Sequence, residues 1–155
     1  MQRKLAAAFA ALAMSAALAT TADGATTTLR MHTQADTTRF LSDSASGIVT
    51  MAKNDTADAK QKWRRTDTSS GYATYNNVDT GRCLTGRGLQ GFPVVTAEQC
   101  VAGALKQQWR LGLSGDLQLR LNGLVAKHNT TGNATGVVMS LFQVASNQKW
   151  HTHPA

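Results

Sequence analysis

The segments Gln61-Lys62-Trp63, Gln107-Gln108-Trp109 and Gln148-Lys149-Trp150 repeat one pattern along the chain. They contain all three tryptophans of the 155 residues, and each tryptophan follows a glutamine by two positions. The tryptophans are 46 and 41 residues apart. A regular period of this length is the mark of a repeat architecture, so we expect three structural units of about 43 residues.

Two further landmarks recur in the same order before each tryptophan. A leucine comes first, as Leu41, Leu84 and Leu124. A β-branched run follows, as Ile48-Val49-Thr50, Val94-Val95-Thr96 and Val137-Val138-Met139. Gly, Ser, Asn and Thr fill the gaps between them, as in hairpin loops. Each unit is therefore predicted to contain a leucine strand, a polar turn, a valine strand, a loop and a tryptophan strand.

The pattern after residue 24 is that of an all-β protein. Residues 117–121, Leu-Gln-Leu-Arg-Leu, alternate as a strand does, and with residues 109–113 they flank a turn at Ser114-Gly115-Asp116. Three units are too few for a propeller, which needs about four blades or more. They suffice to close a small barrel with threefold pseudosymmetry, in which one tryptophan per unit fills a shared core.

The N-terminal segment has the layout of a secretory signal. Arg3 and Lys4 precede an uncharged run from Leu5 to Leu18, and small residues follow. Cleavage is expected after residue 19, 22 or 24, which assigns 1–24 to the signal peptide and predicts a secreted, extracellular protein. The alternative is an uncleaved anchor or a buried helix, although a membrane span needs about 20 apolar residues. No later run approaches that length, so no membrane span is expected.

The remaining composition limits the possible chemistry. Cys83 and Cys100 fit one disulfide of an exported protein, because neither has the partners that a metal site or a catalytic thiol needs. His151 and His153 are interpreted as part of an exposed C-terminal tail. No metal or cofactor is predicted. The net charge of +7 permits loose attraction to acidic polymers. The basic run Lys60, Lys62, Arg64 and Arg65 is interpreted as a solvated turn, since no nucleic-acid motif accompanies it.

The triple Gln-x-Trp repeat resembles the ricin B-type β-trefoil lectins. The middle unit is the most similar, with Asp79-Thr80-Gly81-Arg82-Cys83-Leu84, Val94-Val95, Cys100 and Gln107-Gln108-Trp109. The resemblance implies an all-β trefoil domain over 25–155, with lobes at about 26–66, 67–112 and 113–155, and a disulfide within one lobe. The repeat residues are interpreted as structural: Gln61, Trp63, Gln107, Trp109, Gln148 and Trp150.

In the family that this sequence resembles, an aspartate after the Cys-Leu pair, an aromatic residue and an Asn before the repeat Gln hold the sugar. Here Ser42, Thr85 and Ala126 take the aspartate's place, with Asp43 one residue further on. Ala52, Glu98 and Ser140 align with the aromatic residue. Lys60, Lys106 and Asn147 align with the asparagine. Phe40-Leu41-Ser42 makes the first lobe the loosest match. The sugar sites are therefore expected to be degenerate.

A carbohydrate site is expected in the third lobe, which keeps the most polar groups. Its candidate residues are Asn147, Gln148, His128, Asn129 and Asn133. The leading hypothesis is a secreted, non-catalytic protein that binds a glycan or glycoconjugate. The alternative is a protein-interaction or delivery subunit of a secreted complex or toxin, favoured by the loss of all three aspartates. An enzyme is disfavoured, because no Gly-x-Ser-x-Gly, His-Glu-x-x-His or phosphate-loop pattern is present.

Overall fold

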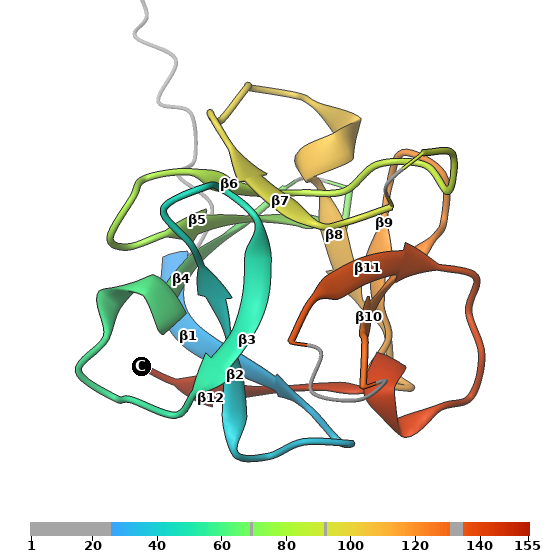
Figure 1. The fold of residues 1–155 in the computed structure, drawn as a ribbon. Coiled ribbons are helices and arrows are strands. Elements are labelled where there is room, and N and C mark those ends of the chain that lie inside the picture. The colour runs from blue at the N-terminus through green and yellow to red at the C-terminus, as the bar shows by residue number, and fades with distance from the viewer. Residues whose placement is uncertain (1–25, 69, 92, 131–134) are drawn as a thin grey trace, which may run out of the picture.

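The computed structural model describes residues 26–68, 70–91, 93–130 and 135–155, and these form an almost entirely β structure (Figure 1). The predicted signal segment and Asn133 lie outside the described residues. The strands fall into three groups of four along the chain. Their bounds are β1 Thr26–Thr33, β2 Arg39–Asp43, β3 Val49–Lys53, β4 Trp63–Asp67, β5 Ala73–Asn77, β6 Cys83–Thr85, β7 Thr96–Glu98, β8 Trp109–Leu111, β9 Leu117–Leu119, β10 Val125–His128, β11 Val137–Ser140 and β12 Trp150–Pro154.

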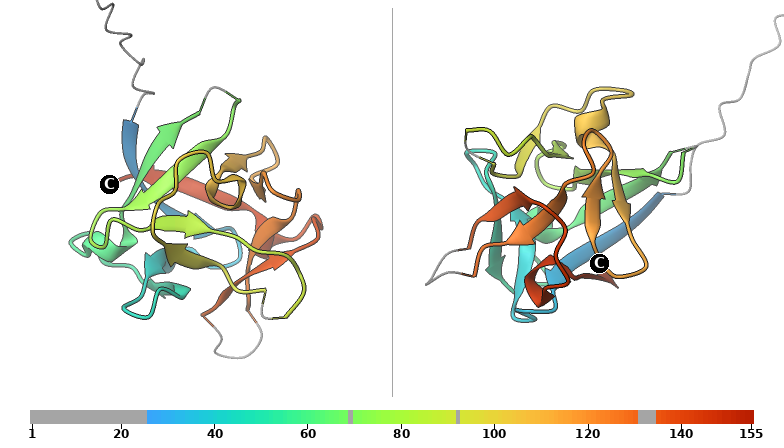
Figure 2. Two further views of the ribbon diagram at one scale, coloured as in Figure 1. Left: turned by 90° about the horizontal axis from the view of Figure 1, so that it is seen from above. Right: turned by 90° about the vertical axis from the view of Figure 1, so that its right-hand side faces the viewer.

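Six of these strands form a ring. Antiparallel pairing runs in the order β9, β8, β5, β4, β1 and β12. The ring is closed by a bridge between Asp116 and Lys149, beside which the amide of Trp150 donates to the carbonyl of Gly115 at 2.7 Å. Figure 2 shows from two further sides how the C-terminal strand β12 lies against β1. The first and last repeats are thereby joined into one barrel.

The other six strands form three hairpins that cover one end of the barrel. They are β2–β3, β6–β7 and β10–β11, and their second strands meet near the centre of the view in Figure 1. The amide of Val49 donates to Val95 at 3.1 Å, and the amide of Val95 donates to Val137 at 2.8 Å. All three valine side chains are buried. One valine of each repeat therefore joins the three hairpins at their common axis.

The three tryptophans occupy equivalent places in the core, as the repeat predicted. Each indole is at most 2% exposed. Each Nε1–H donates to a backbone carbonyl of the preceding hairpin at 2.8–2.9 Å; the acceptors are Leu41, Leu84 and Ala126. A buried indole that keeps its hydrogen bond is the favourable way to place tryptophan in a core. The three indoles therefore pack in the core, where the structural interpretation of the tryptophans expects them.

The sequence alignment of the third repeat was wrong by two residues at its first hairpin strand. The acceptor there is Ala126, so Ala126, and not Leu124, is the counterpart of Leu41 and Leu84. Strand pairing agrees, because Ala126 lies opposite Met139 as Leu41 lies opposite Met51. The residue that follows the core position is therefore Lys127. Ala126 does not take the place of the sugar-binding aspartate but lies in the core.

Each repeat also contains a strand before the leucine strand and a turn before the tryptophan strand, and the repeat pattern did not include them. The additional first strands are β1, β5 and β9, of which only β9 was predicted, as one arm of the hairpin with β8. A short 3₁₀ helix ends at each repeat glutamine: η1 Ala59–Gln61, η2 Leu105–Gln107 and η3 Ser146–Gln148. His151 and His153 belong to β12 and pair with β1. The interpretation of these histidines as a tail was therefore wrong.

One disulfide joins Cys83 of β6 to Cys100, as predicted. It closes a loop within the second lobe. Among the residues that the structure describes, no helix is long and apolar enough to span a membrane.

Candidate functional site

Each repeat glutamine fixes the loop that follows the second hairpin strand. Its side chain is at most 1% exposed, so both ends of its amide need partners inside the protein. In every lobe the amide Nε2 donates to one loop carbonyl, and Oε1 accepts from the amide two residues later. The loop partners are Lys53 and Asp55, Gln99 and Val101, and Leu141 and Gln143, at 2.6–3.1 Å. One residue in the middle of each loop is thereby held in a defined place.

The three residues that the repeat glutamines hold in the middle of these loops differ in chemistry. Asn54 in the first lobe accepts a hydrogen bond from the Arg30 guanidinium. Cys100 in the second lobe is used by the disulfide. Phe142 in the third lobe is 49% exposed. The third lobe alone therefore presents an aromatic ring at this position, on a loop that Gln148 holds from both sides.

Polar groups accompany Phe142 on the surface of the third lobe. Lys127 and Ser140 are half-buried residues of β10 and β11, and Asn147 is a half-buried residue of the turn that also carries Gln148. The amide Nδ2 of Asn147 donates to the His128 carbonyl at 3.1 Å. This bond fixes the Asn147 side chain and leaves its Oδ1 atom in position to accept a hydrogen bond from a ligand. The lobe thus combines an apolar ring with a cation, a hydroxyl and an amide.

The corresponding place in the second lobe is filled by charged side chains. The Glu98 carboxylate accepts from Arg87 at 2.6 Å, from Lys106 at 2.7 Å and from Thr96 at 2.9 Å. Burial alone would raise the pKa of Glu98, but these hydrogen bonds outweigh it and lower the pKa to about 2. With its cations and its carboxylate already paired, this lobe offers few free groups to a ligand.

The hairpin residue that follows the core position is not available to a ligand in the first two lobes. The Ser42 side chain is buried, and its hydroxyl donates to the carbonyl of Asp43. Thr85, its counterpart in the second lobe, is buried as well and donates to the Cys83 carbonyl at 2.8 Å. Neither hydroxyl is directed to a ligand. Of the three equivalent positions only Lys127 is partly exposed.

No protein-family model matches the chain, and no curated protein matches it. Solved structures do. The designed 3-fold symmetric protein ThreeFoil superposes with a TM-score of 0.67 at 20% identity, covering 81% of this chain and 96% of ThreeFoil. The chain has the β-trefoil fold. The expected fold class is confirmed by this match.

Two longer proteins contain the same trefoil. A mosquitocidal holotoxin matches with a TM-score of 0.73 at 19% identity, over 84% of this chain and 17% of the toxin chain. The Polyporus squamosus lectin bound to Neu5Acα2-6Galβ1-4GlcNAc matches with a TM-score of 0.71 at 12% identity, over 83% of this chain and 49% of the lectin. This chain therefore spans about half the length of the lectin and a sixth of the toxin.

The candidate residues of the third lobe separate into buried and accessible groups within the trefoil. Gln148 is fully buried and His128 is 2% exposed. Asn147 and Asn129 are half-buried at the surface, and the Asn147 bond to the His128 carbonyl brings them close together. Gln148 therefore acts on the surface through the loop that it holds, and the accessible amides are Asn147 and Asn129.

Phe142 was not among the predicted site residues. The signal that could have identified it is the trefoil repeat itself. Cys100 lies seven residues before Gln107, and Phe142 lies six residues before Gln148. The one-residue difference in loop length, together with the change from cysteine to phenylalanine, hides the equivalence in the sequence.

Asp43 has a structural role between two lobes of the trefoil. Its carboxylate is fully buried and accepts two hydrogen bonds from Arg82, each at 2.9 Å, as well as one from Thr80. Asp43 therefore joins the first hairpin to the second lobe and is not available as a ligand group.

The Glu98 cluster makes the stability of the trefoil depend on pH. Because folding lowers the pKa of Glu98 from 4.5 to about 2, its contribution is complete above pH 4.5 and is lost as the pH falls toward 2. We expect that loss to be on the order of 1–3 kcal/mol for this partly exposed group. In Glu98→Gln this part of the acid dependence should disappear. Urea unfolding of both proteins at pH 6 and pH 3 measures the difference, and equal acid sensitivity would contradict the assignment.

Proposed function

We propose that the protein is a secreted, non-catalytic carbohydrate-binding trefoil that holds a neutral sugar on its third lobe. The observation that carries this proposal is the exposed Phe142 ring on a loop fixed by Gln148. An aromatic ring that is both exposed and held in place can stack on the apolar face of a pyranose without a large loss of its own freedom on binding.

The neighbouring polar groups suit the hydroxyls of the same sugar. Asn147 supplies a carbonyl acceptor and Lys127 supplies an ammonium donor. The Ser140 hydroxyl donates to the Leu141 carbonyl at 3.1 Å and accepts from Gln148 at 3.2 Å, so it offers a sugar only its remaining lone pair. A shallow site needs only a few convergent groups to fix orientation, while the ring supplies the contact area. No carboxylate is needed in this arrangement, so it differs from the aspartate-based site that the sequence resemblance implies.

The Polyporus squamosus lectin supports carbohydrate binding in general, since a protein with this fold is bound to the acidic trisaccharide Neu5Acα2-6Galβ1-4GlcNAc. Fold alone does not give function, and the proposal of a neutral sugar rests on Phe142 and its polar neighbours. Export is supported by the N-terminal pattern of residues 1–24 and by the Cys83–Cys100 disulfide, because disulfides persist in oxidising compartments.

A broad glycan array tests this function. The mature chain, labelled on exposed lysines, is expected to bind at least one class of neutral glycan on the array and to be released when the free sugar is added. Because monovalent shallow sites are weak, the array is read with the protein clustered on beads. Absence of binding across the whole panel would overturn the proposal.

A second candidate function is the delivery of a toxin or another partner protein. It is favoured by the holotoxin match and by three strongly exposed apolar side chains, Leu113, Leu141 and Val144. A gene for a secreted nuclease or ADP-ribosyltransferase beside this one, with a complex of the two products in gel filtration, would favour delivery. A monomeric chain with no such neighbour would favour the carbohydrate-binding role.

A further inference from the structure

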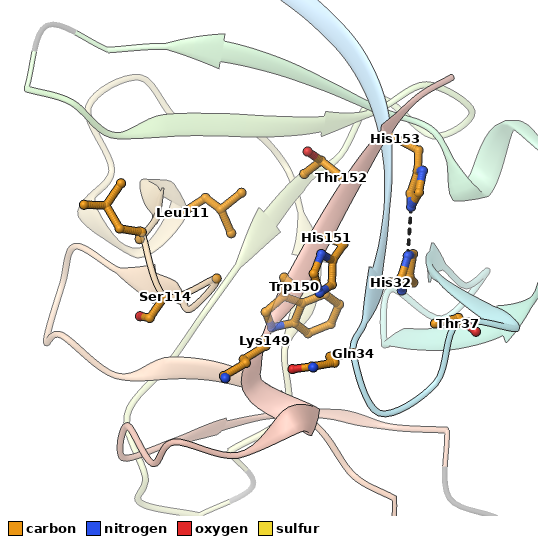
Figure 3. A pocket seen from close by; sticks show the side chains of 13 residues that line it. His32, Gln34, Thr37, Leu111, Ser114, Lys149, Trp150, His151, Thr152 and His153 are labelled. Atoms are coloured by element: carbon orange, nitrogen blue, oxygen red, sulfur yellow. Dashed lines mark hydrogen bonds between the residues drawn. The ribbon is translucent and has the colours of Figure 1, made fainter.

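A cavity of about 810 Å³ lies on the side of the barrel, and none of the loop residues held by the repeat glutamines lines it. It is bounded by β1 with the turn after it, by β12, and by the turn between β8 and β9 (Figure 3). All three repeats contribute to its walls, so it exists only once the barrel has closed. Its volume is in the range of small-ligand sites. None of the polar third-lobe residues discussed above lines it.

Three histidines from β1 and β12 lie together along one wall. His32 Nε2 and His153 Nε2 are 2.8 Å apart, joined by the dashed line in Figure 3, and the His151 ring stacks on His32 at 5.4 Å. His32 Nδ1 donates to the Thr33 carbonyl at 2.9 Å, so His32 Nε2 is the acceptor of the bond from His153. This arrangement leaves Nδ1 of the exposed His153 able to take up a proton without breaking the pair.

The charges around the histidines are predominantly positive. Lys149 lines the cavity, and no described carboxylate lies within ion-pair distance of it. The Arg30 guanidinium lies 4.1 Å from the centre of the Phe40 ring, which is packed in turn against His32 and His153. No acidic residue is among the described residues that line the cavity.

The carboxylates nearest to the cavity along the chain are already engaged. Asp36 accepts from Thr38 and forms an ion pair with Arg39 at 3.1 Å. Asp116 accepts from the Ser114 hydroxyl. On the other side of β1, Arg64 of β4 donates to Asn76. The Asp116 carboxylate lies next to Gly112 and keeps its charge, but it is not among the described residues that line the cavity. The described lining therefore holds histidines and Lys149 and no carboxylate, which makes an anion the complementary ligand.

The other walls combine apolar and hydrogen-bonding groups. Leu111 and Leu113 are exposed at the cavity and provide an apolar surface. Gln34, Thr37 and Ser114 provide amide and hydroxyl groups. A second, smaller cavity shares Thr37 and continues past Arg39 and Lys53. Such walls fit a ligand that carries hydroxyls and ring C–H groups besides its negative charge.

We propose that this cavity binds an acidic saccharide, whose carboxylate is held among His153, His32 and Lys149 and whose sugar rings lie against the leucines. This site is independent of the third-lobe site and does not require the proposed neutral-sugar function. It gives the protein a second ligand class, and the adjoining basic cavity allows an oligosaccharide to extend beyond the first sugar.

Binding at this site strengthens as the pH falls. Burial lowers the pKa of His153, and the neighbouring positive charges of His32, Arg30 and His151 lower it further. His153 is therefore neutral at neutral pH, where Lys149 faces the anion. A proton taken up at His153 Nδ1 on acidification adds a positive charge beside the ligand without breaking the bond to His32, while uronic carboxylates remain ionised.

The test uses a hyaluronan tetrasaccharide and its carboxyl-reduced, neutral counterpart, titrated into ¹⁵N-labelled protein at pH 7.5 and pH 5.5. The acidic tetrasaccharide is expected to shift the imidazole signals of His32, His151 and His153, with at least fivefold tighter binding at pH 5.5. The neutral counterpart is expected to leave these signals unchanged. Equal binding of the two sugars, no shift at the histidines, or the same affinity at both pH values would overturn the proposal.

Variants distinguish the cavity from general attraction to a basic protein. Lys149→Ala and His153→Gln should each weaken binding at pH 5.5 by at least fivefold. Lys62→Ala is the matched control, because Lys62 occupies the same place in the Gln-Lys-Trp segment of the first lobe and does not line the cavity. An equal loss in Lys62→Ala would indicate nonspecific attraction and contradict the assignment. Inorganic sulfate that competes as well as the tetrasaccharide would contradict a saccharide ligand.

Discussion

Replacement of Trp109 by alanine is expected to lower the free energy of unfolding by about 3–5 kcal/mol. The indole is completely buried, and its Nε1–H donates to the Leu84 carbonyl at 2.8 Å. A Cβ placed on Gly86 would come within 2.8 Å of the same ring, so backbone and indole are packed with no space between them. Alanine would leave a large cavity and an unsatisfied carbonyl.

Threefold symmetry makes this prediction sharper. Trp63→Ala and Trp150→Ala should cost similar amounts, because both indoles are buried and make the same bond to a hairpin carbonyl. Trp109→Phe should cost less, since it keeps one aromatic ring and loses the N–H donor and the five-membered ring of the indole. Urea unfolding monitored by far-ultraviolet circular dichroism measures all four. A loss below about 1 kcal/mol for any of the alanine variants would contradict the common structural role.

The second large effect is expected on binding. Phe142→Ala should weaken the affinity for a glycan selected on the array by at least about tenfold, because exposed aromatic anchors dominate small interfaces of this kind. The ring is 49% exposed, so its removal should change the free energy of unfolding little. Titration calorimetry of the variant and the wild type, each first checked by thermal unfolding, gives both numbers.

Val144→Ala provides the matched control for Phe142. It removes another exposed apolar side chain from the same loop, 81% exposed and two residues away, outside the residues that Gln148 brackets. Its affinity should equal that of the wild type. If both variants bound as the wild type does, Phe142 would not be the stacking platform, and the third-lobe proposal would be wrong.

The sequence contained enough to predict the fold because the decisive residues are large, rare and repeated. Trp63 and its two counterparts each combine a buried ring with one fixed hydrogen bond, and such positions tolerate few alternatives. The first strand of a repeat was less visible. In β5 the buried residues are Ala73, Tyr75 and Asn77, of which one is small and one is polar. The alternation of hydrophobic and polar residues is therefore too weak to reveal this strand in the sequence.

The register of the third hairpin could not be read from the sequence. Leu124 and Ala126 are both buried, and the larger residue was the natural choice for a core position. The hydrogen bond from Trp150 to the Ala126 carbonyl decides between them, and that bond depends on backbone position, not on the type of side chain. Local composition cannot specify such a contact between residues 24 apart.

The candidate site was predictable only in outline. Sequence reasoning selected the third lobe from its amides, and the structure keeps Asn147 and Asn129 at the surface there. It included Gln148 and His128, which are buried, because polarity alone does not show whether a side chain faces ligand or backbone. The histidine-lined cavity was missed, since His32 and His153 are brought together only when the first and last strands pair.

The most direct measurement of the central claim is a backbone amide NMR titration with the strongest neutral glycan of the array. We expect shift changes concentrated at Lys127, Ser140, Phe142 and Asn147, and their loss in Phe142→Ala. No comparable changes are expected around Glu98 in the second lobe or Ser42 in the first. Shifts centred on either of those lobes, or a full response in Phe142→Ala, would contradict sugar binding by the third lobe.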